Sequence, residues 1–278
     1  MLIARNLVCC FVGCLCTFMI SAANADDVNI AKAAKKVKQI VAHRGASLER
    51  PECTLVSCRR AIDVGATAIE VDVRTSKDGH LVILHDRTLD RTTDGTGPVN
   101  KKTLAELKKL DAGSWVSKRY RNERIPTLRE VLKVCKGKTD VLLDLKESGA
   151  EYDKKVVNEV NKYGDSEQIV IGVRSVEQAR RLRKLLPKAR QIGLIPDTKS
   201  IEAFAKAGVE TIRLWPKWLT DSSLVERVRK AGAKLHLNGS TGKRDEVIPL
   251  LKHAPDSLSS DDPKRLIRTL RELAASEV

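Results

Sequence analysis

The stretch "AIEVDVRTSKDGHLVILHD", residues 68–86, predicts two short strands around a Lys-Asp-Gly turn. Successive side chains on a strand point to opposite faces, so Glu70 and Asp72 share one face and the apolar residues beside them share the other. Two structures fit this pattern. In an amphipathic surface strand, both acids would face water. In a strand of a parallel barrel, the apolar face would pack on outer helices, and the acids would point inward at the end where active sites form.

Short apolar runs alternate with segments of helical period along most of the chain. Eight runs predict strands, at residues 39–45, 68–73, 140–146, 169–173, 191–195, 211–215, 234–238 and 256–260. A helix is expected after each strand, at residues 52–64, 127–136, 151–163, 175–186, 199–208, 220–232, 243–252 and 263–275. Alternating strands and helices form parallel sheets, and eight such units predict an α/β fold, a (β/α)8 TIM barrel; a doubly wound open sheet is the alternative.

A long interruption, residues 81–125, separates the second strand from its helix. It is rich in Thr, Gly and Asp. This length exceeds that of an ordinary strand-to-helix loop but is too short for an independent domain. We expect a small subdomain, about residues 87–124, inserted at the active end of the barrel.

The first 25 residues have the layout of a secretory signal peptide. One cation precedes an uncharged apolar run at about residues 7–22, and the Ala-Asn-Ala that ends at Ala25 suits a signal peptidase. The run is short for a membrane span, so no stable span is expected. We expect cleavage after about Ala25, a mature barrel of residues 26–278 and a secreted or periplasmic protein; lipid attachment at Cys14 is the alternative.

The composition limits the cofactors and partners. Four of the seven cysteines precede the expected cleavage point, so no disulfide scaffold is expected; a single Cys58–Cys135 bridge is the alternative. The formal net charge of +15 favours anionic partners. Only 3% of the residues are aromatic, which leaves few rings on which bases could stack, so a nucleic-acid partner is not expected.

Polar residues collect at the predicted C-terminal ends of the strands, the end of a barrel that carries the chemistry. They are His43 and Arg44 of strand one, Glu70 and Asp72 of strand two, His85 of the hairpin, Asp144 and Lys146 of strand three, and Asn238 of strand seven. Buried acids at this density require a cation, because desolvation and mutual repulsion would otherwise raise their pKa values. An all-oxygen trio suits Ca²⁺ or Mg²⁺, whereas zinc prefers His or Cys. Two histidines beside such an ion suit the roles of acid and base, so these parts predict metal-assisted phosphoryl transfer.

Several ordered motifs run through the chain: HRGAxxxxPExT at 43–54, ExD at 70–72, HDxxLDRTTxGxGxV at 85–99, TLAELKKLDAGSW at 103–115, IPTL at 125–128 and the DLK of strand three. Together they resemble the glycerophosphodiester phosphodiesterase family, in order across residues 39 to about 263. The resemblance implies a barrel with a small insertion and one Ca²⁺ or Mg²⁺ ion. It also implies hydrolysis of a glycerophosphodiester to glycerol 3-phosphate and an alcohol.

The resemblance assigns an implied role to most of these residues. In the family's mechanism a glycerol hydroxyl held by the metal attacks phosphorus, one histidine protonates the departing alcohol, and water then opens a cyclic phosphate. His43 and His85 match the acid/base pair, Glu70, Asp72 and Asp144 fall at the metal ligands, and Arg44 matches a phosphate contact with Lys146 beside it. Asn238 and Trp215 are further candidates for substrate contact, at the ends of strands seven and six.

This chain departs from the family pattern at several positions. The third ligand is usually Glu, and Asp144 is one methylene shorter; the related spider-venom type phospholipases D resemble this chain in having Asp there, and they can stop at the cyclic product. Cys53 replaces the Asn of the usual PENT, and the neighbouring Glu52 and Thr54 are interpreted as a helix start. Strand seven reads LHLN where the family usually has a Trp, and the final SSDDP is similar to the family's TDxP. The remaining histidines, His80, His236 and His253, are expected to be structural or solvated.

The sequence therefore predicts a secreted, metal-dependent phosphodiesterase that acts on a small-molecule glycerophosphodiester. One alternative is a lysophospholipase D-like enzyme that releases a cyclic phosphate. Another is a barrel without turnover that binds phosphodiesters or anionic surfaces. The intact residues His43, His85, Glu70 and Asp72 favour the enzyme.

Overall fold

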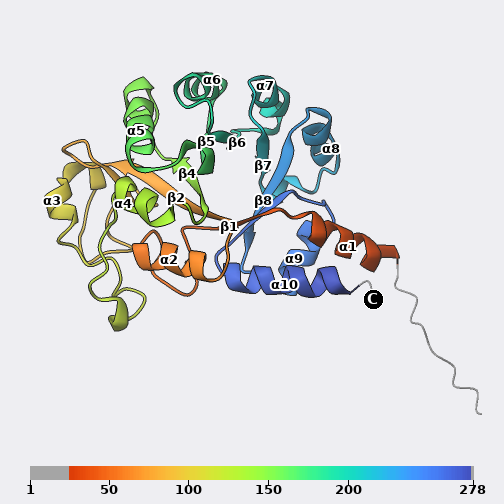
Figure 1. Cartoon of the computed structure of the whole chain (residues 1–278), viewed down its shortest axis with the longest axis horizontal. Helices are drawn as coiled ribbons and strands as arrows, with labels where there is room; N and C mark the ends of the chain where they lie inside the picture. Colours follow the sequence, from red (N-terminus) through yellow and green to blue (C-terminus); the bar gives the residue numbers. More distant parts are fainter. Residues whose placement is uncertain (1–24, 277–278) are drawn as a thin grey trace, which may run out of the picture.

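Eight parallel strands form a closed barrel in the computed structural model of the chain, which describes residues 25–276 (Figure 1). They are β1 (Gln39–Ala42), β2 (Ala68–Thr75), β4 (Asp140–Leu145), β5 (Ile169–Val173), β6 (Arg190–Gly193), β7 (Thr211–Leu214), β8 (Lys234–Ser240) and β9 (Ser257–Ser260). Their order is β1-β9-β8-β7-β6-β5-β4-β2, and β1 also pairs with β2, so the ring has no open edge. The predicted TIM barrel is confirmed, and the doubly wound open sheet is wrong.

Helices follow the barrel strands, one after each, and lie outside the ring, close to their predicted positions. They are α2 (Leu55–Asp63), α4 (Leu128–Cys135), α5 (Ala150–Tyr163), α6 (Val176–Leu185), α7 (Ile201–Lys206), α8 (Ser223–Lys230), α9 (Arg244–Leu251) and α10 (Pro263–Ala275), with short 3-10 helices η3 (Ser166–Gln168), η4 (Thr198–Ser200) and η5 (Pro216–Trp218) in the connections. Side-chain oxygens at Thr54, Thr127, Ser175 and Asp262 accept backbone N–H groups at four of the helix starts. These caps satisfy donors that the first turn of a helix leaves unpaired, so the chain itself marks where these helices begin.

Both faces of β2 are buried, which explains why acids and apolar side chains alternate along it. Ile69, Val71 and Val73 belong to the core that the strands share with the surrounding helices. Glu70 and Asp72 point to the other face and are only 7% and 1% exposed. The surface-strand interpretation is therefore wrong. The interior of the barrel is filled by a separate apolar cluster of Val41, Ala68, Leu142, Val170, Ile192 and Leu194.

The first strand is shorter than predicted, because it ends at Ala42 and not at Gly45. Arg44 and Gly45 have positive φ angles of 55° and 82°, which extended backbone does not have. The chain turns here, and the backbone N–H of Arg44 donates to Oε2 of Glu70 over 2.8 Å. This turn brings the end of β1 against the acids of β2.

Gly45 is expected to be essential for this turn. A Cβ at this position would overlap Ser57, and the left-handed backbone adds its own cost. We expect Gly45→Ala to lower the free energy of unfolding by about 2–4 kcal/mol. Gly65→Ala is the matched control, since Gly65 has φ 85° with no atom within 4 Å, and should lose only about 1 kcal/mol. Denaturant unfolding measures both values, and equal losses would show that the overlap with Ser57 has no effect.

Residues 81–125 form the expected insertion between β2 and α4. Strand β3 (Leu81–Ile83) pairs antiparallel with the end of β2, and η1 (Val99–Lys101), α3 (Leu104–Leu107) and η2 (Lys118–Tyr120) follow it. The insertion has its own small core of Val82, Leu84, Leu89, Val99, Leu107, Ala112 and Ile125. Figure 1 shows it beside α2 and α4, at one side of the barrel. The hairpin places His85 two residues after β3.

An additional helix, α1 (Ala25–Lys36), precedes the barrel where the sequence analysis predicts no element. Ala31, Ala33 and Ala34 are buried, and α1 packs along α10 (Figure 1). The alanines of α1 thus form a buried face, and the lysines between them hide this apolar pattern in the sequence. The predicted signal peptide lies outside the described residues, apart from Ala25. Over residues 25–276 we find no helix with the length and apolar character that crossing a membrane requires.

Candidate active site

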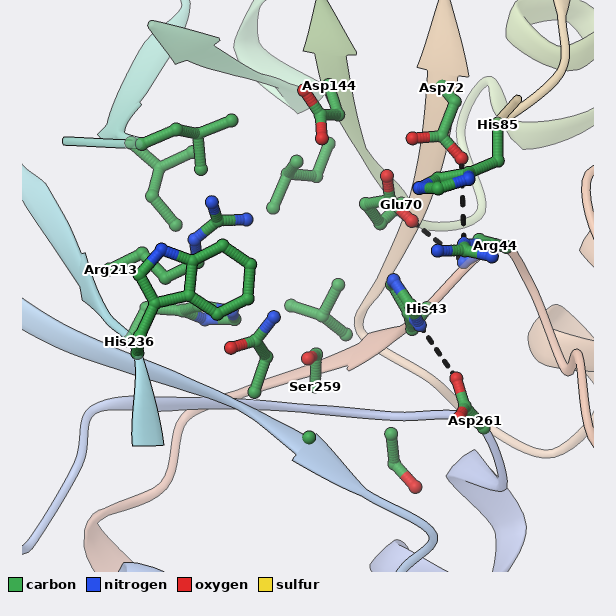
Figure 2. A pocket seen from close by; sticks show the side chains of 18 of the residues that line it. His43, Arg44, Glu70, Asp72, His85, Asp144, Arg213, His236, Ser259 and Asp261 are labelled. Carbon is green, nitrogen blue, oxygen red and sulfur yellow. Dashed lines mark hydrogen bonds and ion pairs between the residues drawn. The ribbon is translucent and has the colours of Figure 1, made fainter. Parts of the chain in front are cut away.

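A cavity of about 470 Å³ lies inside the C-terminal ends of the barrel strands (Figure 2). Every predicted site residue lines it. The barrel therefore brings together His43, Arg44, Glu70, Asp72, His85, Asp144, Lys146, Trp215 and Asn238. Since active sites of TIM barrels form at this end, the cavity is the candidate active site.

Three buried carboxylates, Glu70, Asp72 and Asp144, form the centre of this site, and we call them the carboxylate triad. Each offers an oxygen within 4.8 Å of the oxygens offered by the other two. Asp72 and Asp144 face each other across neighbouring strands, because they are register partners of β2 and β4. The donors are all oxygen, which fits Ca²⁺ or Mg²⁺ better than zinc. The triad could thus hold one hard divalent cation.

The carboxylate triad is under electrostatic stress that a cation would relieve. Burial and the neighbouring charge of Asp72 raise the pKa of Glu70 to about 8. Burial also acts to raise the pKa of Asp144, but the cations Lys146 and Arg174 outweigh it and hold that pKa below its usual range. Lys146 places its ammonium nitrogen 2.7 Å from an oxygen of Asp72 and 2.7 Å from an oxygen of Asp144. Of these two acids, Glu70 is therefore the one whose ionised form is still destabilised by burial and by the charge of Asp72.

Each of the two predicted catalytic histidines is held by a carboxylate. Nδ1 of His43 lies 2.7 Å from Asp261, the residue that follows β9. Nδ1 of His85 lies 2.7 Å from Asp86. Burial acts to lower the pKa of His43, but the hydrogen bond with Asp261 contributes to a pKa above the usual value. In both rings Nε2 is the nitrogen left to meet a ligand in the cavity.

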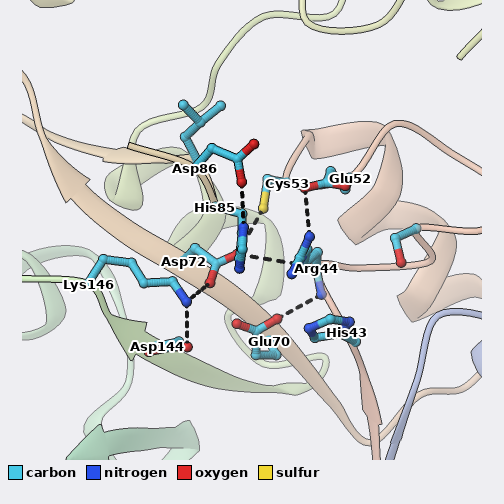
Figure 3. A network of polar contacts seen from close by, with 12 residues as sticks. His43, Arg44, Glu52, Cys53, Glu70, Asp72, His85, Asp86, Asp144 and Lys146 are labelled. Carbon is cyan, nitrogen blue, oxygen red and sulfur yellow. Dashed lines mark hydrogen bonds and ion pairs between the residues drawn. The ribbon is translucent and has the colours of Figure 1, made fainter. Parts of the chain in front are cut away.

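Arg44 projects its guanidinium toward the triad from the turn after β1 (Figure 3). Nη1 donates to Glu52 over 3.0 Å, and Nε lies 3.8 Å from Asp72. This Nε is buried and has no hydrogen-bond partner. A buried donor without a partner costs free energy, so it is suited to an oxygen of a bound phosphate.

Glu52 has a larger role than the helix start predicted from the sequence. Its two oxygens accept hydrogen bonds from Arg91 over 2.7 and 2.8 Å, in addition to the bond from Arg44. Arg91 also binds Asp86, the partner of His85. Glu52 therefore connects Arg44, through Arg91, to Asp86, the partner of His85, while Thr54 alone caps α2.

Cys53 occupies a strained position beside the triad, with φ 58°. Its thiol donates to Asp72 over 3.4 Å, and burial raises its pKa well above the usual value, so it stays protonated. Cys58 and Cys135 are buried free thiols, so the alternative of a bridge between them is wrong. Cys53 therefore acts as a neutral hydrogen-bond donor to a carboxylate of the triad.

Several cavity residues are absent from the prediction. Arg174 and Arg213 have no motif of their own, and Asp261 is noted only through the similarity of SSDDP to a family motif. His236 is expected to be structural or solvated; it is buried, with Nδ1 2.8 Å from Ser257, yet it also lines the cavity. Position is the available signal for three of them, because Arg174, Arg213 and Asp261 lie at or near the C-terminal ends of barrel strands, whereas His236 lies in the first half of β8. Trp218 packs against the core and does not line the cavity.

Comparison with known proteins agrees with this geometry. Residues 43–265 match the model of the Glycerophosphoryl diester phosphodiesterase family. The glycerophosphodiester phosphodiesterase of Caldanaerobacter subterraneus subsp. tengcongensis is 35% identical over 240 residues, which cover 84% of this chain and 98% of the relative.

Solved structures show the same barrel. The glycerophosphodiester phosphodiesterase from Agrobacterium tumefaciens has a TM-score of 0.73 and 30% identity, covering 83% of this chain and 99% of its own. An Oleispira antarctica phosphodiesterase in complex with the product sn-glycerol-3-phosphate has a TM-score of 0.77 and 28% identity, covering 86% of this chain and 99% of its own. The chain therefore belongs to the glycerophosphoryl diester phosphodiesterase family of enzymes.

Proposed function

We propose that this chain hydrolyses a glycerophosphodiester to glycerol 3-phosphate and an alcohol, using one divalent cation and a pair of histidines. One observation carries the proposal: two histidines, each held at Nδ1 by a carboxylate, share a cavity with three buried carboxylates. Paired histidines provide an acid and a base, and clustered carboxylates provide the ligands of a hard cation.

The carboxylate triad would hold the cation, Ca²⁺ or Mg²⁺. When bound, such an ion neutralises the triad, polarises the phosphoryl group and favours ionisation of an attacking hydroxyl. Arg44 and Lys146 would bind the non-bridging oxygens of the phosphate, because both point at the triad from opposite sides (Figure 3). Together these groups offset the negative charge of the diester.

The histidines would move protons at Nε2. One ring would take the proton of an attacking glycerol hydroxyl, and the other would give a proton to the oxygen of the departing alcohol, which leaves a cyclic phosphate on the glycerol. Water would then open the cyclic phosphate. Asp261 and Asp86 would keep Nε2 of each ring directed at the substrate and stabilise the imidazolium that forms. Over the whole cycle one water is consumed and the diester yields a phosphate monoester and an alcohol.

Phosphorus NMR of residues 26–278 with glycerophosphocholine and glycerophosphoethanolamine tests the proposal. We expect glycerol 3-phosphate to appear with Ca²⁺ or Mg²⁺, to stop with EDTA and to resume when the ion is restored. Accumulation of a cyclic phosphate would instead support the lysophospholipase D-like alternative. That alternative is considered because Asp144 stands where the family usually has Glu. Absence of turnover with metal bound, on these diesters and on lysophospholipids, would support the non-catalytic binder.

Metal affinity is expected to depend on pH through Glu70. Its pKa of about 8 means that Glu70 is mostly protonated at neutral pH, and a metal ligand must be ionised. We therefore expect Ca²⁺ affinity to rise up to about tenfold per unit of pH below 8 and to level off above it. Calorimetry in two buffers with different ionisation enthalpies should show release of about one proton per ion near pH 7. An affinity that is constant from pH 6 to pH 9 would contradict the assignment of Glu70 as a ligand.

We also propose that the protein is secreted or periplasmic. The support is the N-terminal sequence alone: one cation, an apolar run and an Ala-Asn-Ala site that ends at Ala25. N-terminal sequencing of the exported protein tests this, and a mature chain that begins near Asp26 is the expected result.

A further inference from the structure

The wall of the cavity that faces the catalytic groups is built by four residues, Arg213, Trp215, His236 and Asn238, which we call the far wall. Figure 2 shows Arg213 and His236 across the cavity from His43 and His85. Three strands separate β7 from β2 in either direction around the ring. The far wall therefore lies opposite the strand that carries Glu70 and Asp72, where the part of a substrate beyond the scissile phosphate would extend.

Arg213 is the cation of this cavity that has no acidic partner among the described residues. The other three cations of the cavity each form an ion pair: Arg44 with Glu52, Lys146 with Asp72, and Arg174 with Asp144. Arg213 has no hydrogen bond or ion pair in the described part of the chain, and its Nε is buried without a partner. Its guanidinium lies over the ring of Trp215, 4.2 Å from the centroid. Asp144 and Glu70 act on Arg213 only at longer range. A guanidinium stays charged even when partly buried, so Arg213 lacks a counter-ion in direct contact, which a ligand could supply.

The other groups of the far wall also indicate which ligand fits. Arg174, whose side chain is partly exposed in the same cavity, adds a second positive charge. His236 cannot act as a counter-ion, because burial and the nearby charge of Arg213 lower its pKa to about 3 and keep it neutral. Oδ1 of Asn238 is a buried acceptor without a donor. A ligand that fits the far wall would therefore supply an anion to pair with Arg213 and a hydroxyl or other hydrogen-bond donor for Oδ1 of Asn238.

We propose that the far wall is a second anion site, which selects glycerophosphodiesters whose alcohol part is itself a phosphorylated polyol. This inference rests on the proposed phosphodiesterase function and specifies its substrate class. A choline or ethanolamine group would bring a cation close to Arg213 and Arg174, and Arg213 already covers one face of the indole that would otherwise bind it. In the proposed function the scissile phosphate would have its own contact in Arg44, which lies beside Asp72 on the opposite side of the cavity.

Three substrates test the proposal by their kcat/KM values. Glycerophosphoglycerol has a neutral alcohol, 1,3-bis(glycerophospho)glycerol has the same alcohol with a second glycerophosphate, and glycerophosphocholine has a cationic alcohol. We expect the doubly phosphorylated diester to exceed glycerophosphoglycerol by about tenfold or more, as one charge-assisted hydrogen bond would produce, and choline to be the poorest. In Arg213→Gln the ratio of the first two should fall toward about two, the ratio of their scissile bonds, because only the ion-paired Arg174 then remains to attract the second phosphate.

Matched variants separate a binding effect from a change of fold or of net charge. Arg213→Lys keeps the charge and should retain part of the preference. Lys217→Gln removes an exposed cation nearby that does not line the cavity, and should leave the ratio as in the unaltered chain. Arg174→Gln is a poorer test, because it also removes a partner of Asp144. Arg213→Gln should melt no lower than the unaltered chain, since the substitution removes a partly buried charge that forms no ion pair.

A binding measurement keeps the second anion site testable without turnover. Calorimetry with Ca²⁺ and 1,3-bis(glycerophospho)glycerol, on the His43→Ala background, should show at least about tenfold weaker binding when Arg213 is glutamine. If Arg213→Gln weakens binding but the unaltered chain hydrolyses no diester, the proposed function is refuted and the anion site is supported. Equal binding, or an equal loss of kcat/KM on all three substrates, would refute the anion site whatever the turnover.

Discussion

Replacing His43 with glutamine is expected to lower kcat for glycerophosphodiester hydrolysis by about 10²–10⁴-fold, the contribution of a well-placed general acid or base. Nδ1 of His43 bonds Asp261, so Nε2 is the nitrogen available for proton transfer, and glutamine has no group that titrates. KM should change by less than about threefold, because Arg44 and Lys146, the proposed phosphate contacts, are unaltered. Steady-state kinetics with a saturating metal concentration measures both constants.

His80→Gln is the matched control for this substitution. His80 lies in the turn between β2 and β3, outside the cavity, and its loss should not alter kcat. Asp261→Asn should reduce kcat less than His43→Gln does, because Asp261 acts on the ring through its hydrogen bond with Nδ1 and the imidazole itself remains. It should also move the pH limb that belongs to His43 toward lower pH, since the hydrogen bond with Asp261 acts to raise the pKa of His43. A kcat of His43→Gln near that of the unaltered chain would remove His43 from the mechanism.

Replacing Glu70 with glutamine is expected to weaken binding of Ca²⁺ or Mg²⁺ and to lower kcat/KM by about 10²–10³-fold at limiting metal, because the ion supplies several kcal/mol of charge stabilisation. Without metal, glutamine should replace Glu70 with little effect on the fold. With its pKa of about 8, Glu70 is mostly neutral near pH 7, and a glutamine oxygen can still accept the N–H of Arg44. The variant should therefore melt close to the unaltered chain when no metal is present.

Calorimetric titration with each metal, together with melting curves with and without EDTA, provides the measurement. The unaltered chain should gain stability on metal addition, whereas Glu70→Gln should gain little. Glu49→Gln removes one carboxylate outside the cavity and serves as the control for net charge. Metal affinity of Glu70→Gln equal to that of the unaltered chain would mean that the ion, if any, binds elsewhere.

Most of the site could be predicted because strand position determines it. Glu70, Asp72 and Asp144 occupy inward positions on two neighbouring strands, His43 directly follows β1, and His85 lies two residues after β3. Once the barrel is assigned, alternation along β2 is enough to place the acids inside. Helix α1 could not be predicted in this way, because its buried face consists of three alanines whose partner is the far end of the chain, helix α10.

The contacts that tune the site depend on residues far apart in sequence. Asp261 meets His43 because ring closure pairs β9 with β1, and Glu52 connects to Arg91 because the insertion folds back over the turn after β1. In the sequence, nothing distinguishes Arg213 from the other arginines and lysines. Its lack of an acidic partner becomes visible only when its neighbours across the barrel are known.

The barrel, the carboxylate triad and the two histidines follow from the order of the residues, since near-neighbour periodicity sets which face of a strand is buried. The carboxylate that holds His43, the strength of the burial effect on Glu70 and the lack of an ion pair at Arg213 follow from the folded barrel alone. Electrostatic energies depend on through-space distance and desolvation, and both are set when strands distant in sequence close into one ring.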